Sequence, residues 1–528
     1  MYDPTGLTVL VLFGVVILVL SILARRTGAN APVLLTLGGV ALAFIPVTAD
    51  LRVPPELVVL LFLPALLYWE SLTTSLQEIR QDLRTLVLSS VFLVLATAGA
   101  VAVTAHHVLG IGWPIAFVLG AIVAPTDATA VSAVARSLPR RELTMLRAES
   151  LVNDGTALVL FGVALAVALG EQEFSPLGAL GDFALSYVGG TLIGLAVAWL
   201  AVLARRAARD PMLENVVSVL TPFVAFLLAE EIHASGVLAV VVCGLAIGRV
   251  GPRLISARTR VQAHAFWRIT TFLLNAALFV LVGVQLPRAL ADVSSRSVGA
   301  AIGAALLIAA VVVVTRLAWY YTIPYLIRLV DRRAAQRARR ISARGRLPLG
   351  WCGFRGAVSL AIALAVPLTT TTGAPLPERD LLIVVAFGVI LVTLVGQGLT
   401  LPWVIRFARY APDTAVDEEI LLARRRTLEA ALDALDRVAT EHAASEDVVR
   451  RLRTEHERRR HLLDPPDEDP DEADHDAEKS LRMALLEERR ARLLRLRDEA
   501  EIDDAVLMVV QAELDNEEMG LRGAPGPE

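Results

Sequence analysis

Apolar stretches of membrane-spanning length recur along the chain from Leu7 to about Phe407. A helix needs about 20 apolar residues to cross a hydrocarbon core that is roughly 30 Å thick. The qualifying stretches start near residues 7, 31, 53, 85, 111, 143, 178, 212, 233, 264, 297, 348 and 380. The loops between them are too short for separate domains, which argues against buried helices of a large soluble protein. With 55% hydrophobic residues and a mean hydropathy of +0.59, we predict an all-α polytopic membrane protein with about 13 transmembrane helices.

The balance of charge changes near residue 410. Residues 1–410 carry 32 Arg or Lys and 21 Asp or Glu, whereas residues 411–528 carry 18 and 33. We therefore predict a transmembrane domain over 1–410 and an acidic tail over 411–528. In the tail, 416–462 and 477–520 have helical apolar spacing and flank an acidic linker at 464–476. The tail is either a solvated helical appendage or a regulatory or dimer-supporting domain.

The distribution of arginines predicts an orientation. With the N-terminus outside and thirteen alternating spans, the inside loops hold 23 Arg and the outside loops hold 4. Short Arg-rich loops stay cytoplasmic, so we expect a protein of the cell (inner) membrane with its C-terminal tail in the cytoplasm. The first apolar stretch ends at Arg25–Arg26 rather than at a small-residue cleavage site, so we expect no cleavable signal peptide.

The stretch 121–134 contains a helix breaker with polar residues directly behind it. Pro125 lacks a backbone N–H and disrupts a helix, and Thr126 and Asp127 follow at once. A broken helix at membrane depth is tolerated where it lines a cavity or is buried in protein, and its freed backbone groups suit ion coordination. The alternative is a simple proline kink with an incidental aspartate, and the position of Asp127 beside the break argues against it.

A second polar cluster lies within the stretch that starts near 143. On a helix, Glu149 lies over Asn153 and Ser150 lies over Asp154, so two carboxylates, a hydroxyl and an amide share one face. Ionisable groups at membrane depth are costly and normally line a pathway or have a partner. This cluster therefore predicts a wet, functional face. The alternative is a capping cluster, although these residues lie several positions into the span.

Two more charges fall inside apolar spans. Arg355 lies between Gly353 and Gly356, which permit an unwound or closely packed backbone. A buried arginine needs an anion, for which Glu149 is our first choice and Asp127 our second; otherwise Arg355 snorkels to the cytoplasmic interface. Glu70 lies toward the inner end of a proline-containing span and either faces a cavity or reaches the interface.

Motifs of several other protein classes are missing from the sequence. There is no Walker motif, no His-Glu-x-x-His zinc motif, no Gly-x-Ser-x-Gly elbow and no nucleic-acid-binding module. Cys243 and Cys352 both lie in apolar stretches and have no metal-binding spacing. We therefore expect a protein that is not an enzyme, has no cofactor, binds no nucleic acid and draws its energy from an ion gradient.

Three motifs together carry a family resemblance. Pro125-Thr126-Asp127, Glu149-Ser150-x-x-Asn153-Asp154 and Gly353-Phe354-Arg355-Gly356 occur in the order and approximate spacing of sodium/proton exchangers. Over about residues 5–410 the chain resembles the prokaryotic NhaP type of cation–proton antiporter. The resemblance implies inverted repeats, two crossed discontinuous helices at Thr126 and Arg355, and a moving core domain beside a dimerisation domain in a homodimer.

The resemblance also implies roles for individual residues. The cation- and proton-binding residues would be Asp154, Asp127, Ser150, Thr126 and, as a further carboxylate, Glu70. The first four would hold Na+, with Thr126 contributing backbone oxygen. Glu149 and Arg355 would form a structural ion pair, and Asn153 and Pro125 would support the site. The Asn153-Asp154 pair resembles the electroneutral members of the family, because electrogenic relatives carry two aspartates there.

The resulting hypothesis is a secondary antiporter that exchanges Na+ or Li+ for H+ in pH and sodium homeostasis. Asp154 and Asp127 would bind either a cation or protons, and the loaded site would cross by rocking of one helix bundle. Three rival readings stay open at this point. They are a K+/H+ antiporter of the same fold, a passive cation channel and an intramembrane aspartyl protease.

Overall fold

The structure is a computed structural model, and the residues that it describes are 5–45, 58–74, 76–127, 138–171, 173, 175–208, 210–291, 297–330, 342–410, 415–461, 472–499 and 504–522. The regular secondary structure in these ranges is helical. All the regular elements in these ranges are α-helices or short π-helical turns. The predicted all-α class is confirmed.

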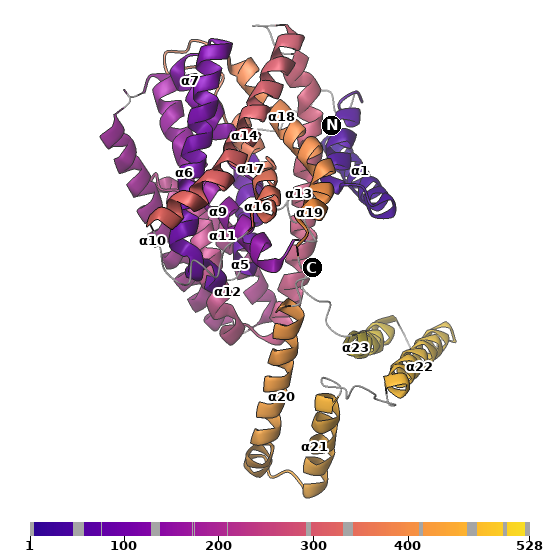
Figure 1. Cartoon of the computed structure of the whole chain (residues 1–528). Coiled ribbons are helices and arrows are strands. Elements are labelled where there is room, and N and C mark those ends of the chain that lie inside the picture. The colour runs from indigo at the N-terminus through magenta and orange to yellow at the C-terminus, as the bar shows by residue number, and fades with distance from the viewer. Residues whose placement is uncertain are drawn as a thin grey trace. The chain divides into compact units, whose positions relative to one another are not determined.

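The first part of the chain is a bundle of closely spaced helices (Figure 1). Their bounds are α1 Thr5–Thr27, α2 Ala31–Leu42, η1 Val58–Phe62, α5 Leu63–Thr73, α6 Leu76–Leu109, α7 Trp113–Val123, α9 Arg140–Leu169, α10 Pro176–Ala208, α11 Pro211–Glu231, α12 Gly236–Leu254, α13 Ala257–Ala291, α14 Val298–Val330, α16 Ala343–Trp351, α17 Ala357–Leu364, α18 Arg379–Val392, η2 Thr393–Gln397 and α19 Gly398–Ala408.

The predicted apolar stretches all have helical counterparts. Among the described residues, eight helices are long and apolar enough to cross a membrane: α1, α6, α9, α10, α11, α13, α14 and the continuous run α18–η2–α19. Shorter apolar helices are α2, η1–α5, α7 and α12. The stretch near 348 forms the short helices α16 and α17. How many of these elements cross the bilayer stays a prediction.

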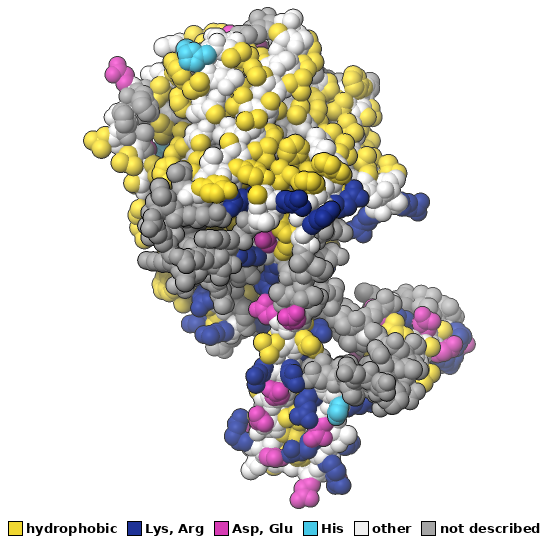
Figure 2. Space-filling model, viewed as in Figure 1, with side chains coloured by type: hydrophobic (Ala, Val, Ile, Leu, Met, Phe, Trp, Pro, Cys, Tyr) yellow, Lys and Arg dark blue, Asp and Glu magenta, His cyan; other side chains and the backbone are white. Residues whose placement is uncertain are grey.

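The outer surface of the bundle is apolar. Large hydrophobic side chains face outward on α1 and α10, among them Leu10, which is 70% exposed, and Leu177, which is 80% exposed. Figure 2 shows hydrophobic side chains covering this face, with Lys and Arg side chains gathered toward one end of it. An apolar surface this extensive is incompatible with water but suits lipid. The chain is therefore a multi-pass membrane protein.

The helices pack in groups that converge on the middle of the bundle. α6, α7 and α9 pack against one another and α14 packs on α6 and α18, whereas α5, α10, α11 and α12 form a second group. α2 lies along α13, where Gly39 and Gly283 permit backbone contact: a Cβ on either glycine would overlap the carbonyl oxygen of Val280 or Thr36. Small residues at a helix crossing serve the same purpose in other membrane bundles.

Contacts divide the chain into two compact units, Met1–Pro412 and Asp413–Glu528. The second unit consists of two helical hairpins, α20 (Ala415–Glu441) with α21 (Glu446–His461) and α22 (Glu472–Asp498) with α23 (Asp504–Arg522). The predicted stretch 416–462 thus contains α20 and α21, and the predicted stretch 477–520 is shared between α22 and α23. Of the predicted linker 464–476, residues 464–471 lie outside the described residues, and the rest already belongs to α22.

Candidate cation-binding site

Two interruptions of helical structure lie at the centre of the first unit. α7 ends at Val123, and Pro125, Thr126 and Asp127 are not helical. α16 ends at Trp351, and α17 begins only at Ala357. Both predicted breaks are therefore present. The continuation of the first one, residues 128–137, lies outside the described residues.

The two interruptions are joined by a main-chain hydrogen bond. The N–H of Asp127 donates to the carbonyl oxygen of Phe354 over 2.8 Å. Gly356 lies against the Asp127 side chain so closely that a Cβ at this position would overlap its carboxylate oxygen. The position of the Asp127 carboxylate thus depends on the conformation of the segment 352–356.

Arg355 satisfies backbone carbonyls rather than a carboxylate. Its Nε donates to the carbonyl oxygen of Val123 over 2.9 Å, and its Nη1 donates to the carbonyl oxygen of Gly353. The last carbonyls of a helix have no intrahelical partner and carry partial negative charge. Arg355 therefore caps the C-terminal end of α7 where Pro125 breaks it. Because its side chain is only 1% exposed, the snorkelling alternative is excluded.

The predicted ion pair between Glu149 and Arg355 is wrong. Glu149 Oε1 pairs instead with Arg316 Nη1 over 2.6 Å, and Tyr320 donates its hydroxyl to Glu149 Oε2. The Arg316 and Glu149 side chains are 1% and 3% exposed. A buried carboxylate needs a charged partner with good geometry, and α14 supplies both partner groups from successive turns. Arg316 was not singled out from the sequence as a buried charge. Placing an arginine within the apolar stretch 298–323 nevertheless costs as much free energy as placing Arg355 in its own apolar stretch.

The polar face of α9 is buried against the first interruption. Ser150 Oγ donates to the carbonyl oxygen of Thr126 over 2.6 Å. The Asn153 amide contacts the Thr126 hydroxyl at 3.3 Å and, with its nitrogen turned toward the backbone, donates to the carbonyl oxygens of Ser90 and Glu149. Since α9 begins at Arg140, these residues do not cap its N-terminus.

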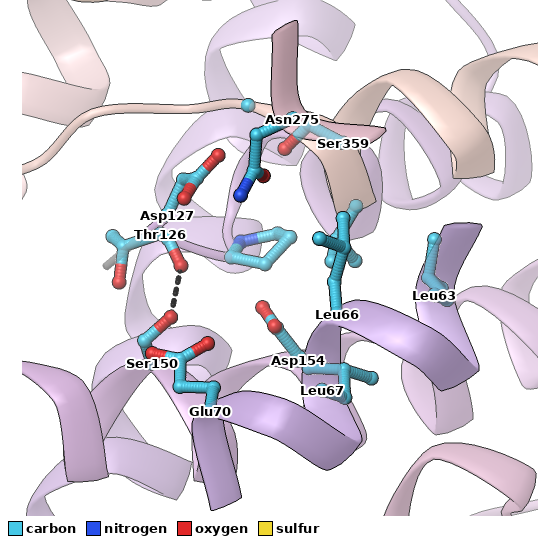
Figure 3. A pocket seen from close by; sticks show the side chains of 13 residues that line it. Leu63, Leu66, Leu67, Glu70, Thr126, Asp127, Ser150, Asp154, Asn275 and Ser359 are labelled. Carbon is cyan, nitrogen blue, oxygen red and sulfur yellow. Dashed lines mark hydrogen bonds between the residues drawn. The ribbon is translucent and has the colours of Figure 1, made fainter. Parts of the chain in front are cut away.

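A cavity of about 30 Å³ lies where these elements meet, and it is large enough for a water-sized occupant. Five of the predicted binding residues line it: Glu70, Thr126, Asp127, Ser150 and Asp154, with Pro125 beside them. Figure 3 shows these side chains around the common space. Glu149, Asn153 and Arg355 are not among the lining residues. Glu70 thus faces the cavity.

The cavity is acidic. Glu70 on α5, Asp127 in the segment after α7 and Asp154 on α9 bring three carboxyl groups to this one small space. Asp154 is 3% exposed, and its Oδ1 has no hydrogen-bond partner among the described residues. A buried carboxylate oxygen without a partner is costly, and either a proton or a cation removes that cost. Oxygen ligands of this kind suit a hard cation.

Sequence reasoning missed two polar lining residues, Asn275 on α13 and Ser359 on α17. Each is a neutral polar residue in an apolar helix, and such residues occur often without a function. The signal that was available for Ser359 is its place in the first turn after the Gly353–Gly356 break. In the described part of the chain, no three His, Cys, Asp or Glu side chains are grouped as for a resident metal ion.

The chain is similar to known transporters over most of its length. A family model described as the transmembrane sodium/hydrogen exchanger matches residues 13–407. An uncharacterized Na+/H+ exchanger of Mycobacterium tuberculosis (strain ATCC 25618 / H37Rv) is 47% identical over 522 residues, which cover 98% of this chain and 96% of the relative. A sodium, potassium, lithium and rubidium/H+ antiporter of Bacillus pumilus (strain SAFR-032) is 31% identical over 414 residues, covering 75% and 61%.

A solved structure supports the fold. The sodium proton antiporter MjNhaP1 from Methanocaldococcus jannaschii at pH 8 superimposes with a TM-score of 0.56 at 18% identity, covering 76% of this chain and 98% of that one. At this identity the likeness concerns the fold alone. The first unit therefore has the antiporter fold, as the sequence predicts.

Proposed function

The chain belongs to the sodium/hydrogen exchanger family, and from this premise we propose that it exchanges Na+ or Li+ for H+ one for one. Membership makes it a transporter of cations and protons rather than an enzyme. The identity of the cation, the stoichiometry and the residues that bind the ions are the parts that we propose.

The observation that carries the proposal is the acidic cavity. Asp154 presents a buried Oδ1, unpaired within the described ranges, to a space that Asp127 and Glu70 also line. Thr126 and Ser150 add oxygen atoms from the broken segment and from α9. We propose that Na+ binds to Asp154, Asp127, Ser150 and Thr126, with Glu70 as a further ligand.

Exchange follows if cation and proton compete for Asp154. An unoccupied site would be a buried bare charge, and moving it across the membrane is penalised. The site therefore changes sides mainly when it is loaded with Na+ or H+, which makes the exchange obligatory. Rocking of one helix group against the other around the site provides alternating access.

The electroneutral stoichiometry rests on Asn153. This neutral residue holds Thr126 and Glu149 in place through its amide and does not line the cavity. The position before Asp154 therefore adds no further titrating carboxylate to the site. We propose a homodimer in the cell membrane, with the N-terminus outside and the tail in the cytoplasm, that serves pH and sodium homeostasis.

A K+/H+ antiporter is the second candidate. The Bacillus pumilus relative, 31% identical to this chain, is named for potassium and rubidium as well as sodium and lithium. The same ligands accept a larger cation if the cavity widens slightly. The proposal of Na+ as the main substrate is therefore tested directly against K+.

Proteoliposomes with a preset pH gradient provide the test. Proton flux is followed with a pH-sensitive dye while Na+, Li+, K+ or choline is added. Dissipation of the gradient by Na+ and Li+ but not by choline, at a rate unchanged when the voltage is clamped, is the expected result. A response to K+ alone would move the substrate to potassium, and a voltage-dependent rate would refute the one-for-one stoichiometry.

A further inference from the structure

Two neutral polar side chains line the cavity but are not among the proposed ligands. Ser359 and Asn275 line it together with the three carboxylates. Figure 3 shows both on the same side of the cavity as Asp127, away from Glu70, Ser150 and Asp154. The proposed ligands Asp154, Asp127, Ser150 and Thr126 include no side chain from α13 or α17.

Ser359 is the more informative of the two residues. Its side chain is 1% exposed, and its Oγ has no hydrogen-bond partner in the part of the chain that the structure describes. Buried hydroxyls are nearly always paired, so an unpaired one requires an explanation. Serine in a helix normally donates to the carbonyl four residues earlier, yet this hydroxyl makes no such bond.

Ser359 does not cap α17, because it lies inside this helix. Gly356 is the N-cap of α17, and no side chain caps this helix. The helix reads AVSLAIAL, so Ser359 is its one polar residue. An alanine would fill the space without leaving a hydroxyl unpaired. The hydroxyl is thus unused by the protein but open to the occupant of the cavity.

We propose that Ser359 Oγ is a direct ligand of the transported cation, contributed by the second interrupted helix. This inference rests on the proposed function. Gly356 touches the Asp127 side chain, Ser359 follows three residues later on α17, and all three residues line the cavity. A cation at Asp127 is therefore within the region that Ser359 lines. The helix break would thus serve both to free backbone groups and to bring a neutral oxygen to the ion.

The test compares two replacements of Ser359 in the full-length protein. Ser359→Ala removes the oxygen, and Ser359→Cys keeps the size of the side chain but replaces oxygen with sulfur, which alkali cations disfavour. The matched control is Ser90→Ala. Ser90 is likewise buried with an unpaired Oγ, but it does not line the cavity.

The main readout is the Na+ concentration that gives half-maximal proton flux in proteoliposomes. We expect both Ser359 variants to raise it by about threefold to tenfold, as for the loss of one polar contact, with a maximal rate within about twofold of the wild type. Ser90→Ala should leave it unchanged. Unchanged half-saturation in Ser359→Ala would overturn the inference. A half-saturating Na+ concentration at the wild-type value in Ser359→Cys would also overturn it, because it would indicate that Ser359 serves in packing. A lower maximal rate with unchanged half-saturation in the Ser359 variants would overturn it as well.

A binding measurement separates this inference from the proposed function. Na+ should raise the unfolding temperature of the purified wild-type protein in detergent relative to choline, and both Ser359 variants should need a several-fold higher Na+ concentration for the same shift. If the wild type binds Na+ but shows no cation-dependent proton flux, the proposed function fails. The shift in unfolding temperature then still tests whether Ser359 is a Na+ ligand. If Na+ protects the variants as it protects the wild type, Ser359 is not a ligand.

Discussion

The main-chain N–H of Asp127 donates to the carbonyl oxygen of Phe354, 2.8 Å away. This bond connects the two places where helices are interrupted inside the bundle, although the residues are more than two hundred positions apart in the sequence. Arg355 adds a second connection through the carbonyl oxygen of Val123. The two breaks therefore form one structural unit, and the Asp127 carboxylate is positioned by both.

Arg316 and Arg355, each only 1% exposed, should respond differently to removal of their charge. Arg316→Met leaves Glu149 buried without its ion-pair partner and should destabilise the protein by about 3–5 kcal/mol. Arg355→Met leaves only backbone carbonyls unpaired and should cost about 1–3 kcal/mol. Unfolding of the purified variants by heat or denaturant in detergent measures both.

A second substitution checks this assignment. Glu149→Gln should recover part of the stability that Arg316→Met loses, because it removes the stranded charge, and it should not rescue Arg355→Met. If Glu149→Gln instead stabilised Arg355→Met and not Arg316→Met, the result would support the ion pair between Glu149 and Arg355 that the sequence predicts. It would contradict the pairing of Glu149 with Arg316 in the structure.

Gly356 should tolerate no side chain. A Cβ at this position would overlap the Asp127 carboxylate, so Gly356→Ala should displace Asp127, destabilise the protein by about 1–3 kcal/mol and strongly reduce exchange. Gly303→Ala on α14 is the matched control, because no atom lies within 4 Å of its added Cβ. Equal exchange rates in the two variants would show that the contact between Gly356 and Asp127 is not needed.

Protons and Na+ should compete. If both bind at Asp154, lowering the pH on the side where Na+ enters should raise the half-saturating Na+ concentration, by up to about tenfold per pH unit where the proton-loaded form dominates, because the linkage is reciprocal. The maximal rate at saturating Na+ should change much less. Half-saturation measured at several pH values checks this, and a pH-independent value would indicate separate sites.

Local sequence features predicted the elements well. Apolar length predicted where helices lie, Pro125 predicted the end of α7, and Gly353 with Gly356 predicted the interruption around Arg355. Each of these depends on the intrinsic properties of a few neighbouring residues. The clustering of Glu149, Ser150, Asn153 and Asp154 on one buried face follows in the same way from helical periodicity.

Partners from distant segments could not be predicted in this way. The sequence indicates that Arg355 and Glu149 each need a partner, but hydropathy carries no information on which of several helices will face them. Arg316 lies in a long apolar helix and was not recognised as a buried arginine. Asn275 and Ser359 were missed because a single neutral polar residue in an apolar helix has no distinctive pattern, and only the fold places them at the cavity.

The most direct test of the account is proton flux in proteoliposomes that contain either the wild type or Asp154→Asn, driven by a preset pH gradient and triggered by Na+. Asp182→Asn, on an exposed position of α10, is the control. Asp154→Asn should insert and fold as the wild type does but show no Na+-dependent flux, whereas the control should exchange normally. Exchange retained by folded, purified Asp154→Asn protein would contradict the central claim that this carboxylate binds cation and proton in turn.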